Sequence, residues 1–319
     1  MELTLSFILV AIGFALLIKA ADYLVDGAAA LAVRFSMSEI VIGLTIVSFG
    51  TSAPELIVNV IASIRGNSEI TLGNVIGSNI INTLLILGVA GLISSIKLEK
   101  NTVWREIPFS LLAAIVLFIA CNDMMLDGQT NLLSRVDGIM FLFFFVIFVA
   151  YTFAVSDVES DHTPDIKTLS KSKIWLYLIL GAIGLFFGGK LVVDNAIDIA
   201  RSLEISEKVV GLTVVAIGTS LPELVTSAVA AFKKKADIAI GNIVGSNIFN
   251  IFFVLAISTI IRPIPFIDEL NVDVLILISI SVILFLIMFT GKKRVIDRWE
   301  SIFLIAIYVA YMTFILFRG

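Results

Sequence analysis

Residues 43–82 read GLTIVSFGTSAPELIVNVIASIRGNSEITLGNVIGSNIIN, and residues 211–250 read GLTVVAIGTSLPELVTSAVAAFKKKADIAIGNIVGSNIFN. The two copies lie 168 residues apart, align without insertion or deletion, and share 19 of 40 positions. Each copy places a glutamate, Glu55 or Glu223, inside an apolar run. A carboxylate at membrane depth is costly unless it faces a polar cavity or a cation. Two such carboxylates in matching halves predict a cation transporter with its site between two repeats.

The composition indicates a membrane protein. Of the 319 residues, 59% are hydrophobic and 15% are charged, and the mean hydropathy is +1.08. A soluble domain of this length is nearer half apolar and a quarter charged. The net charge of −4 comes without a basic patch interleaved with aromatics, so we expect no nucleic-acid partner. The chain begins MELTL, with an acid where a signal peptide carries basic residues, so the first span is expected to be retained.

Apolar runs separated by short polar stretches predict an all-α membrane protein with ten transmembrane helices. The spans are expected near residues 4–24, 39–63, 70–95, 107–122 and 136–155, and near 174–199, 207–231, 238–261, 270–290 and 299–317. We divide the chain into a first five-helix repeat at 1–155, a linker loop at 156–173 and a second five-helix repeat at 174–319. Because five is an odd number, the second repeat enters the membrane from the opposite side, so the repeats are inverted.

Loop charges predict the orientation. Lys and Arg residues number 14 in the loops after the first, third, fifth, seventh and ninth spans, and 7 on the other side. The positive-inside rule then places both termini outside the cell membrane. The equivalent loops at Arg65 and Lys233 differ in basic content, as expected for loops on opposite faces. The lone His162 falls in the linker, where we expect an exposed histidine without a functional role.

The GTSxPE motif is expected to break its helix. Pro54 cannot donate a backbone hydrogen bond and disfavours helix in the residue before it, and Gly50 adds flexibility. Broken backbone at membrane depth is tolerated only where protein or a polar cavity surrounds it. We expect the break to free carbonyls for a cation, including that of Ser48, whose place Ala216 takes in the second copy. Glu55 would then lie in the first turn of a second half-helix, where the helix dipole favours negative charge.

Further oxygens accompany each glutamate. Thr51 lies four residues before Glu55 and Ser52 is adjacent, so their oxygens converge on one side, and Thr219 and Ser220 repeat the arrangement. The following span carries GNxxGSNxxN in both copies, with polar residues spaced by four along one stripe and two glycines forming a face for close helix contact. The deepest polar residues are the better ligand candidates: Ser78, Asn82, Ser246 and Asn250. Asn74 and Asn79 are ligands or structural residues.

The repeat extends upstream of these motifs. Asp26 aligns with Asp194, Ser38 with Ser206, and Glu39 with Glu207. A Ser-Glu pair just before an apolar run is a good helix start. We therefore expect helix-end and capping residues here, with a cation vestibule as the alternative.

All the candidate ligands are hard oxygens, unaccompanied by His, Cys or Met. This chemistry favours Ca²⁺ or Na⁺ over zinc, copper or iron. The two carboxylates match the charge of one Ca²⁺ or two Na⁺. A third Na⁺ would leave one net positive charge, which the membrane potential could then use to drive export.

The two motifs, present in both halves, resemble the α-repeats of the cation/Ca²⁺ exchanger superfamily, and the ten-span layout extends the resemblance to the whole chain. The chain looks like a compact prokaryotic Na⁺/Ca²⁺ exchanger without a large cytosolic regulatory domain. The resemblance implies a secondary active antiporter that exchanges Na⁺ for Ca²⁺ by alternating access. We expect no enzymatic activity and no cofactor, membrane lipid as a partner, and function as a monomer.

The resemblance also implies four cation sites at the repeat interface, with spans one and six sliding across the other eight. It implies a Ca²⁺ site at the two glutamates and the Thr51 and Thr219 regions, and Na⁺ sites at the four serines with two asparagines near the centre. The candidate ligands are Ser48, Thr51, Ser52, Glu55, Ser78, Asn82, Ala216, Thr219, Ser220, Glu223, Ser246 and Asn250. Many sodium-coupled relatives have Asp where this chain has Asn250, so the Na⁺ stoichiometry and any co-transport of K⁺ stay open.

Three other functions are weighed against sodium/calcium exchange. In a Ca²⁺/H⁺ antiporter, Glu55 and Glu223 would exchange protons for Ca²⁺. A passive cation channel fits poorly with an inverted repeat, because the repeat indicates access from two sides. An intramembrane enzyme would use the two glutamates as acid and base, but no nucleophile–base pair accompanies them.

Overall fold

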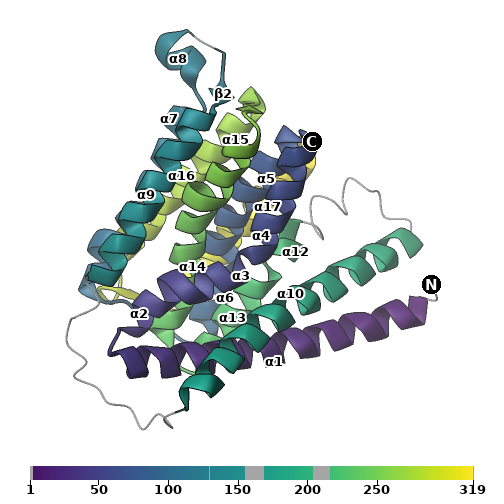
Figure 1. Cartoon of the computed structure of the whole chain (residues 1–319), viewed down its shortest axis with the longest axis vertical. Coiled ribbons are helices and arrows are strands. Elements are labelled where there is room, and N and C mark those ends of the chain that lie inside the picture. The colour runs from purple at the N-terminus through teal and green to yellow at the C-terminus, as the bar shows by residue number, and fades with distance from the viewer. Residues whose placement is uncertain (1–2, 129, 155–168, 204–215, 319) are drawn as a thin grey trace.

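The structure is a computed structural model that describes residues 3–128, 130–154, 169–203 and 216–318. Figure 1 shows a bundle of helices crossed obliquely by two long helices that lie side by side, α1 and α10. Among the described residues, eight helices are long and apolar enough to cross a membrane. A ninth span is the pair Glu39–Thr51 and Ala53–Arg65, which is bent by 48°. The prediction of an all-α membrane protein with a broken helix is confirmed.

The tenth predicted span, near residues 207–231, is described only in part. From Ala216 it consists of α12 (Ala216–Thr219) and the short apolar helix α13 (Leu221–Phe232). Its first residues lie outside the part of the chain that the structure describes, as do the linker and His162.

The first half contains nine α-helices, three π-helical segments and two short strands within its described residues. These are α1 (Leu3–Phe35), α2 (Glu39–Ile42), η1 (Gly43–Val47), α3 (Ser48–Thr51), α4 (Ala53–Arg65), α5 (Ser68–Ile81), η2 (Asn82–Ile86), α6 (Leu87–Ile93), β1 (Ile96–Lys97), η3 (Thr102–Glu106), α7 (Ile107–Ala120), α8 (Asp123–Asp127), β2 (Leu132–Leu133) and α9 (Arg135–Ala154).

The second half continues with the same kinds of element. After α10 (Lys171–Ser202), α12 and α13 come α14 (Ala236–Phe249), the π-helix η5 (Asn250–Leu255), α15 (Ala256–Ile261), β3 (Ile264–Pro265), the 3₁₀-helix η6 (Asp268–Leu270), α16 (Asn271–Ile287), β4 (Val295–Ile296) and α17 (Arg298–Arg318).

Two short antiparallel ladders show how the halves are related. β1 pairs with β4, and β2 pairs with β3, so each ladder takes one strand from each half. β1 and β3 are equivalent positions 168 residues apart, yet they belong to different ladders. Because α7 runs between β1 and β2, the two ladders lie at opposite ends of the bundle. Equivalent strands at opposite ends are what an inverted repeat produces.

The pairing of α1 with α10 depends on glycine. A Cβ on Gly181 would lie 2.8 Å from the Leu24 nitrogen, and one on Gly188 would lie 3.1 Å from the Leu17 nitrogen. The two backbones therefore approach too closely for a larger residue. The predicted end of the first span near residue 24 was wrong, because α1 continues to Phe35 and its second half packs on α13 as well.

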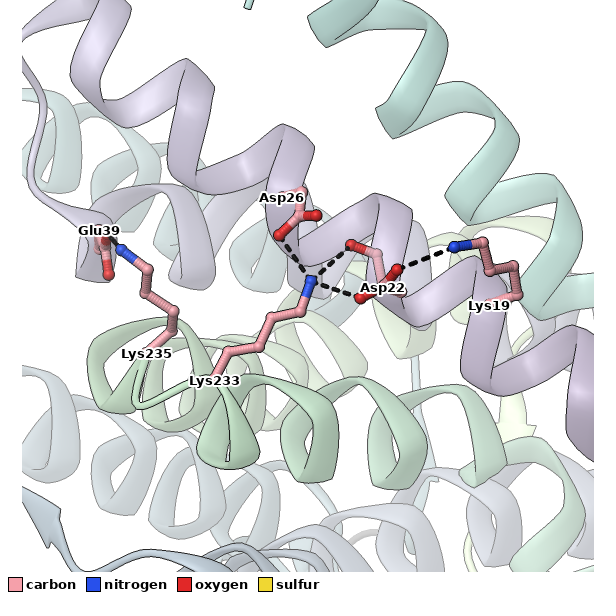
Figure 2. Close-up of polar contacts among 6 residues, drawn as sticks. All are labelled: Lys19, Asp22, Asp26, Glu39, Lys233 and Lys235. Atoms are coloured by element: carbon pink, nitrogen blue, oxygen red, sulfur yellow. Dashed lines mark hydrogen bonds and ion pairs between the residues drawn. The ribbon is translucent and has the colours of Figure 1, made fainter. Parts of the chain in front are cut away.

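Ion pairs connect α1 to the loop between α13 and α14 (Figure 2). Lys233 Nζ lies 2.5 Å from Asp22 Oδ1 and 2.6 Å from Asp26 Oδ1. Lys235 Nζ lies 2.5 Å from Glu39 Oε1 at the start of α2. Asp26 therefore lies within α1 and not at a helix end, which corrects the expectation from the repeat. Ser38 does precede α2, but its side chain makes no capping hydrogen bond.

Candidate cation site

Both copies of GTSxPE break the helix at their serine. α3 ends at Thr51, Ser52 has φ −84° and ψ 8°, and α4 begins at the next residue with its proline in the first turn. In the second copy Ser220 has φ −89° and ψ 5°, and α13 begins in the same way. The proline starts each second half-helix, so the glutamate that follows it lies in the first turn. The break predicted from the motif is confirmed.

The Ser48 carbonyl is not free in this conformation. It accepts from the Ser52 N–H at 2.9 Å, and the Thr51 hydroxyl oxygen lies 3.3 Å away. The expectation that the break frees this carbonyl was wrong here, because the break is confined to a single residue and the preceding turn keeps its backbone bond. In the second copy the Ser220 N–H bonds to Ile217 instead, at 3.1 Å, so that turn is tighter.

The two carboxylates are fully buried, and each is bonded from the opposite half. The Ser52 Oγ lies 2.8 Å from Glu223 Oε1, and the Ser220 Oγ lies 3.4 Å from Glu55 Oε1. The second oxygen of each carboxylate, Oε2, has no hydrogen-bond partner. Ser52 Oγ is also 3.0 Å from Ser246 Oγ. The motifs from the two halves therefore form one buried site.

Two asparagines of the neighbouring helices have an unpartnered oxygen. Asn82 donates through Nδ2 to Asn247 Oδ1 at 3.1 Å, and Asn250 donates to Asn79 Oδ1 at 3.1 Å. The Oδ1 atoms of Asn82 and Asn250 are buried and have no hydrogen-bond partner. Ser78 Oγ is also buried without a partner.

The threonines of the motifs are oriented by asparagines of the other half. Thr51 Oγ1 donates to Asn242 Oδ1 at 2.9 Å, and Thr219 Oγ1 lies 3.2 Å from Asn74 Oδ1. The prediction that Asn74 is a ligand or a structural residue resolves toward structure in this conformation, because its amide also donates to Asn59 at 2.7 Å.

Three kinds of contact occur twice with the two halves exchanged, whereas the Ser52–Ser246 contact occurs once. Ser52 and Glu223 correspond to Ser220 and Glu55, and the threonine–asparagine and asparagine–asparagine bonds form matching pairs in the same way. Reciprocal contacts of this kind are the signature of a two-fold axis. The candidate site therefore lies on the axis that relates the two repeats.

Several residues that orient the site were not predicted from sequence. Asn247 bonds Asn82 and also donates to Thr83 Oγ1 at 2.8 Å, and Asn59 and Ser227 each hold an asparagine of the next helix. Asn59 and Ser227 both follow a glutamate by four residues, so they share its helical face. The sequence could have indicated these two residues, because a polar residue occurs at this position in both repeats.

π-helical turns adjoin the site. Asn82 begins η2 and Asn250 begins η5, while η1 leads into Ser48. Turns of this kind are rare and occur often at functional sites, because the extra residue redirects the side chains around it. Here η2 and η5 begin at the two central amides, Asn82 and Asn250.

The site brings together hydrogen-bond acceptors, and no Lys or Arg side chain is among the contacts described above. Its free oxygens are Glu55 Oε2, Glu223 Oε2, Asn82 Oδ1 and Asn250 Oδ1. In the part of the chain that the structure describes, no group of three or more His, Cys, Asp or Glu residues comes together. Two carboxylates completed by neutral oxygens suit a hard cation.

Comparison with known proteins agrees with this chemistry. Residues 5–154 and 173–317 match the family model described as "Sodium/calcium exchanger protein". The chain belongs to the sodium/calcium exchanger family. It is 34% identical to the sodium/calcium exchanger MaX1 of Methanosarcina acetivorans, over 97% of this chain and 98% of that protein. It is 38% identical to the inner membrane protein YrbG of Escherichia coli, over 80% of this chain and 79% of that protein.

A solved structure agrees over nearly the whole chain. The sodium-calcium exchanger NCX_Mj, soaked with Na⁺ and Sr²⁺, matches with a TM-score of 0.84 at 33% identity, covering 98% of this chain and 99% of that chain. The family consists of membrane antiporters and not of enzymes. This chain is therefore an integral membrane cation/Ca²⁺ exchanger, and the resemblance stated from the motifs is confirmed.

Proposed function

We propose that this exchanger is a secondary active antiporter that moves Na⁺ and Ca²⁺ in opposite directions by alternating access. The observation that carries the proposal is the group of four buried acceptors without a donor, two from carboxylates and two from amides. A buried acceptor left unpaired is destabilising. A cation at the two-fold axis would bond all four.

The residues divide by charge into two kinds of ligand. Glu55 and Glu223 supply the negative charge that Ca²⁺ needs, with Thr51 and Thr219 beside them. The serines supply neutral oxygens suited to Na⁺: Ser52, Ser78, Ser220 and Ser246. Backbone carbonyls at Ser48 and Ala216 would join the shell in a conformation where the local helix opens. Asn82 and Asn250 would supply amide oxygens near the centre, between the Ca²⁺ ligands and the Na⁺ ligands.

The charge balance supports exchange over co-transport. Two carboxylates neutralise one Ca²⁺ or two Na⁺, whereas Ca²⁺ and Na⁺ together would leave excess positive charge in a site of low dielectric. Each ion would therefore displace the other. The repeats at 1–155 and 174–319, joined by the loop at 156–173, would supply the two halves that exchange roles, in a monomer within the cell membrane.

The first test is radiolabelled Ca²⁺ uptake into proteoliposomes. We expect uptake into vesicles loaded with Na⁺ and little uptake into vesicles loaded with K⁺ or with protons alone. A sodium gradient is required because the serines supply neutral sodium ligands beside the carboxylates. Uptake driven by a pH gradient without Na⁺ would replace the proposal with a Ca²⁺/H⁺ antiporter. A requirement for K⁺ on the Na⁺ side would make it a K⁺-dependent exchanger.

A second test concerns orientation. The loop charges place Lys233–Lys235 inside and Arg65 outside, with both termini outside. Cysteines introduced at Asn67 and Ala236, in a Cys121→Ser background, are expected to react with an impermeant maleimide from opposite sides, Asn67 from outside. Cys121 is the only cysteine in the sequence, so its replacement removes background labelling. Reaction of the Asn67 cysteine only from inside would reverse the proposed orientation.

A further inference from the structure

A cavity also lies beside the start of the bent span. It has a volume of about 50 Å³ and is bounded by the start of the bent span, by η3 and by the end of α9. Its lining residues with side-chain oxygens are Ser38, Glu99, Asn101, Thr102, Glu106, Tyr151 and Thr152. The lining reaches Leu44 in the first part of the bent span. None of the candidate ligands of the exchange site lines this cavity, so the two sites are built from different side chains.

Glu106 is the unusual residue of this cavity. Its side chain is buried, with the whole residue 7% exposed, and its Oε2 has no hydrogen-bond partner. The other oxygen, Oε1, has only a long contact of 3.5 Å with the Tyr151 hydroxyl. Arg105 is next in sequence, but its Nη1 is directed to the Tyr151 hydroxyl at 3.2 Å. Among the described residues, no ion pair joins the Glu106 carboxylate to a basic side chain, although Arg105 acts on it electrostatically.

Charges of both signs act on Glu106. Arg105 acts on it with opposite charge, and Glu99, an exposed residue that lines the same cavity, acts on it with like charge. Glu99 also acts electrostatically on Asp237 at the start of α14. A second carboxylate beside a buried one raises the electrostatic cost of keeping both charged unless a cation joins them.

The backbone at this cavity shares a feature with the exchange site. Glu106 and Thr102 lie at the two ends of η3, a π-helix. Of the π-helices in the described residues, η2 and η5 adjoin the exchange site, η1 leads into Ser48 and also contributes Leu44 to this cavity, and η3 lies at the cavity. Such turns are frequently found at functional sites.

We propose that this cavity is a second Ca²⁺-binding site, with the Glu106 carboxylate as its buried anchor. Glu99 supplies the second negative charge, and the neutral oxygens of Asn101, Thr102 and Tyr151 complete the shell. Ca²⁺ fits this set because it accepts six to eight oxygen ligands in flexible geometry and tolerates water among them. The volume holds one ion with little water. The cavity is also lined by Ile40, Val41 and Leu44 of the bent span, so a bound ion would lie against this span.

The test uses Tb³⁺ as a luminescent substitute for Ca²⁺. The full chain is purified with Glu55→Gln and Glu223→Gln together, which removes the carboxylates of the exchange site. Tyr151 lines the cavity, so excitation of aromatic residues should sensitise Tb³⁺ bound there. We expect one class of Tb³⁺ site that Ca²⁺ displaces and that Na⁺ at equal ionic strength does not.

Adding Glu106→Gln should lower the apparent Tb³⁺ affinity by about ten-fold or more, since the anchoring charge is lost. Glu69→Gln, at an exposed acid at the start of α5, is the matched control and should change nothing. A calorimetric titration of the chain with its exchange site intact should likewise lose one Ca²⁺ class on Glu106→Gln alone.

Three results would overturn this assignment. The first is the absence of Ca²⁺-displaceable Tb³⁺ when Glu55 and Glu223 are glutamines, and the second is unchanged affinity after Glu106→Gln. The third is displacement by Na⁺ as readily as by Ca²⁺. The proposed exchange is measured separately by vesicle uptake, so either proposal can fail without the other.

Discussion

Glu55→Gln and Glu223→Gln are each expected to abolish Ca²⁺ transport in proteoliposomes. Both carboxylates are fully buried, and each leaves one oxygen without a partner at the two-fold axis. Glutamine keeps the size of the side chain but removes the charge that a divalent cation needs. Because the two residues occupy equivalent positions, the two single variants should lose activity to a similar extent.

The same variants should separate loss of binding from loss of folding. A ligand that binds only the folded state at 100 times its Kd adds about 2.7 kcal/mol of stability. Ca²⁺ should therefore raise the thermal unfolding midpoint of the unmodified chain more than that of either variant, in which only the proposed second site still binds it. Without Ca²⁺ the variants should be at least as stable as the unmodified chain, since a buried unpaired carboxylate has been removed.

Glu69→Gln provides the control for loss of a carboxylate elsewhere. It removes an exposed acid outside the candidate site and should leave both transport and Ca²⁺ stabilisation unchanged. Near-normal exchange by Glu55→Gln or by Glu223→Gln would remove that residue from the site.

The positions of the spans were predictable because the lipid bilayer around them is apolar. Long apolar runs must be helical in a bilayer, and their bounds agree within a few residues at most ends. The exception is the end of α1. Asp22 and Asp26 lie where a span would be expected to end, but Lys233 pairs with both of them, so the helix continues. That lysine comes from a distant loop, and no local pattern reveals the contact.

The chemistry of the site was predictable from its two charged residues, whereas the orientation of its side chains was not. Glu55 and Glu223 are identifiable because a carboxylate in an apolar run needs an explanation. The roles of Asn79 and Asn247 depend on which amide of the other half faces them, and that follows only from the two-fold packing. The π-helical turns at Asn82 and Asn250 likewise have no sequence signal, because they arise from the way neighbouring helices pack.

The glycines of GNxxGSNxxN were predicted to form a close helix contact, and the second copy makes one. A Cβ on Gly245 would lie 2.6 Å from the Leu44 carbonyl oxygen and 2.8 Å from Ser48 Oγ. A Cβ on Gly241 would lie 2.9 Å from the Gly43 Cα. In the first copy, no described atom lies within 4 Å of a Cβ at Gly73 or Gly77, and the equivalent partner residues 211–215 lie outside the described part of the chain.

Gly245→Ala adds only a methyl group, but it is therefore expected to lower both the stability of the protein and its Ca²⁺ exchange. The obstructing atoms cannot move easily, since one belongs to the backbone and Ser48 Oγ is itself bonded to the Leu44 carbonyl at 2.8 Å. Overpacking of this kind typically destabilises by about 1–3 kcal/mol. It would also push α14, which carries Ser246, away from the bent span that carries Ser52.

Both consequences can be measured against a matched glycine. The thermal unfolding midpoint of Gly245→Ala should fall, and its Ca²⁺ exchange should fall by roughly ten-fold or more, the effect expected when ligand geometry shifts by about 1 Å. Gly189→Ala is the control, because Gly189 is also a buried helical glycine but a Cβ there would meet Pro222 Cγ at 3.7 Å, an ordinary contact. Equal behaviour of the two alanine variants would show that close packing of α14 on the bent span does not hold the site together.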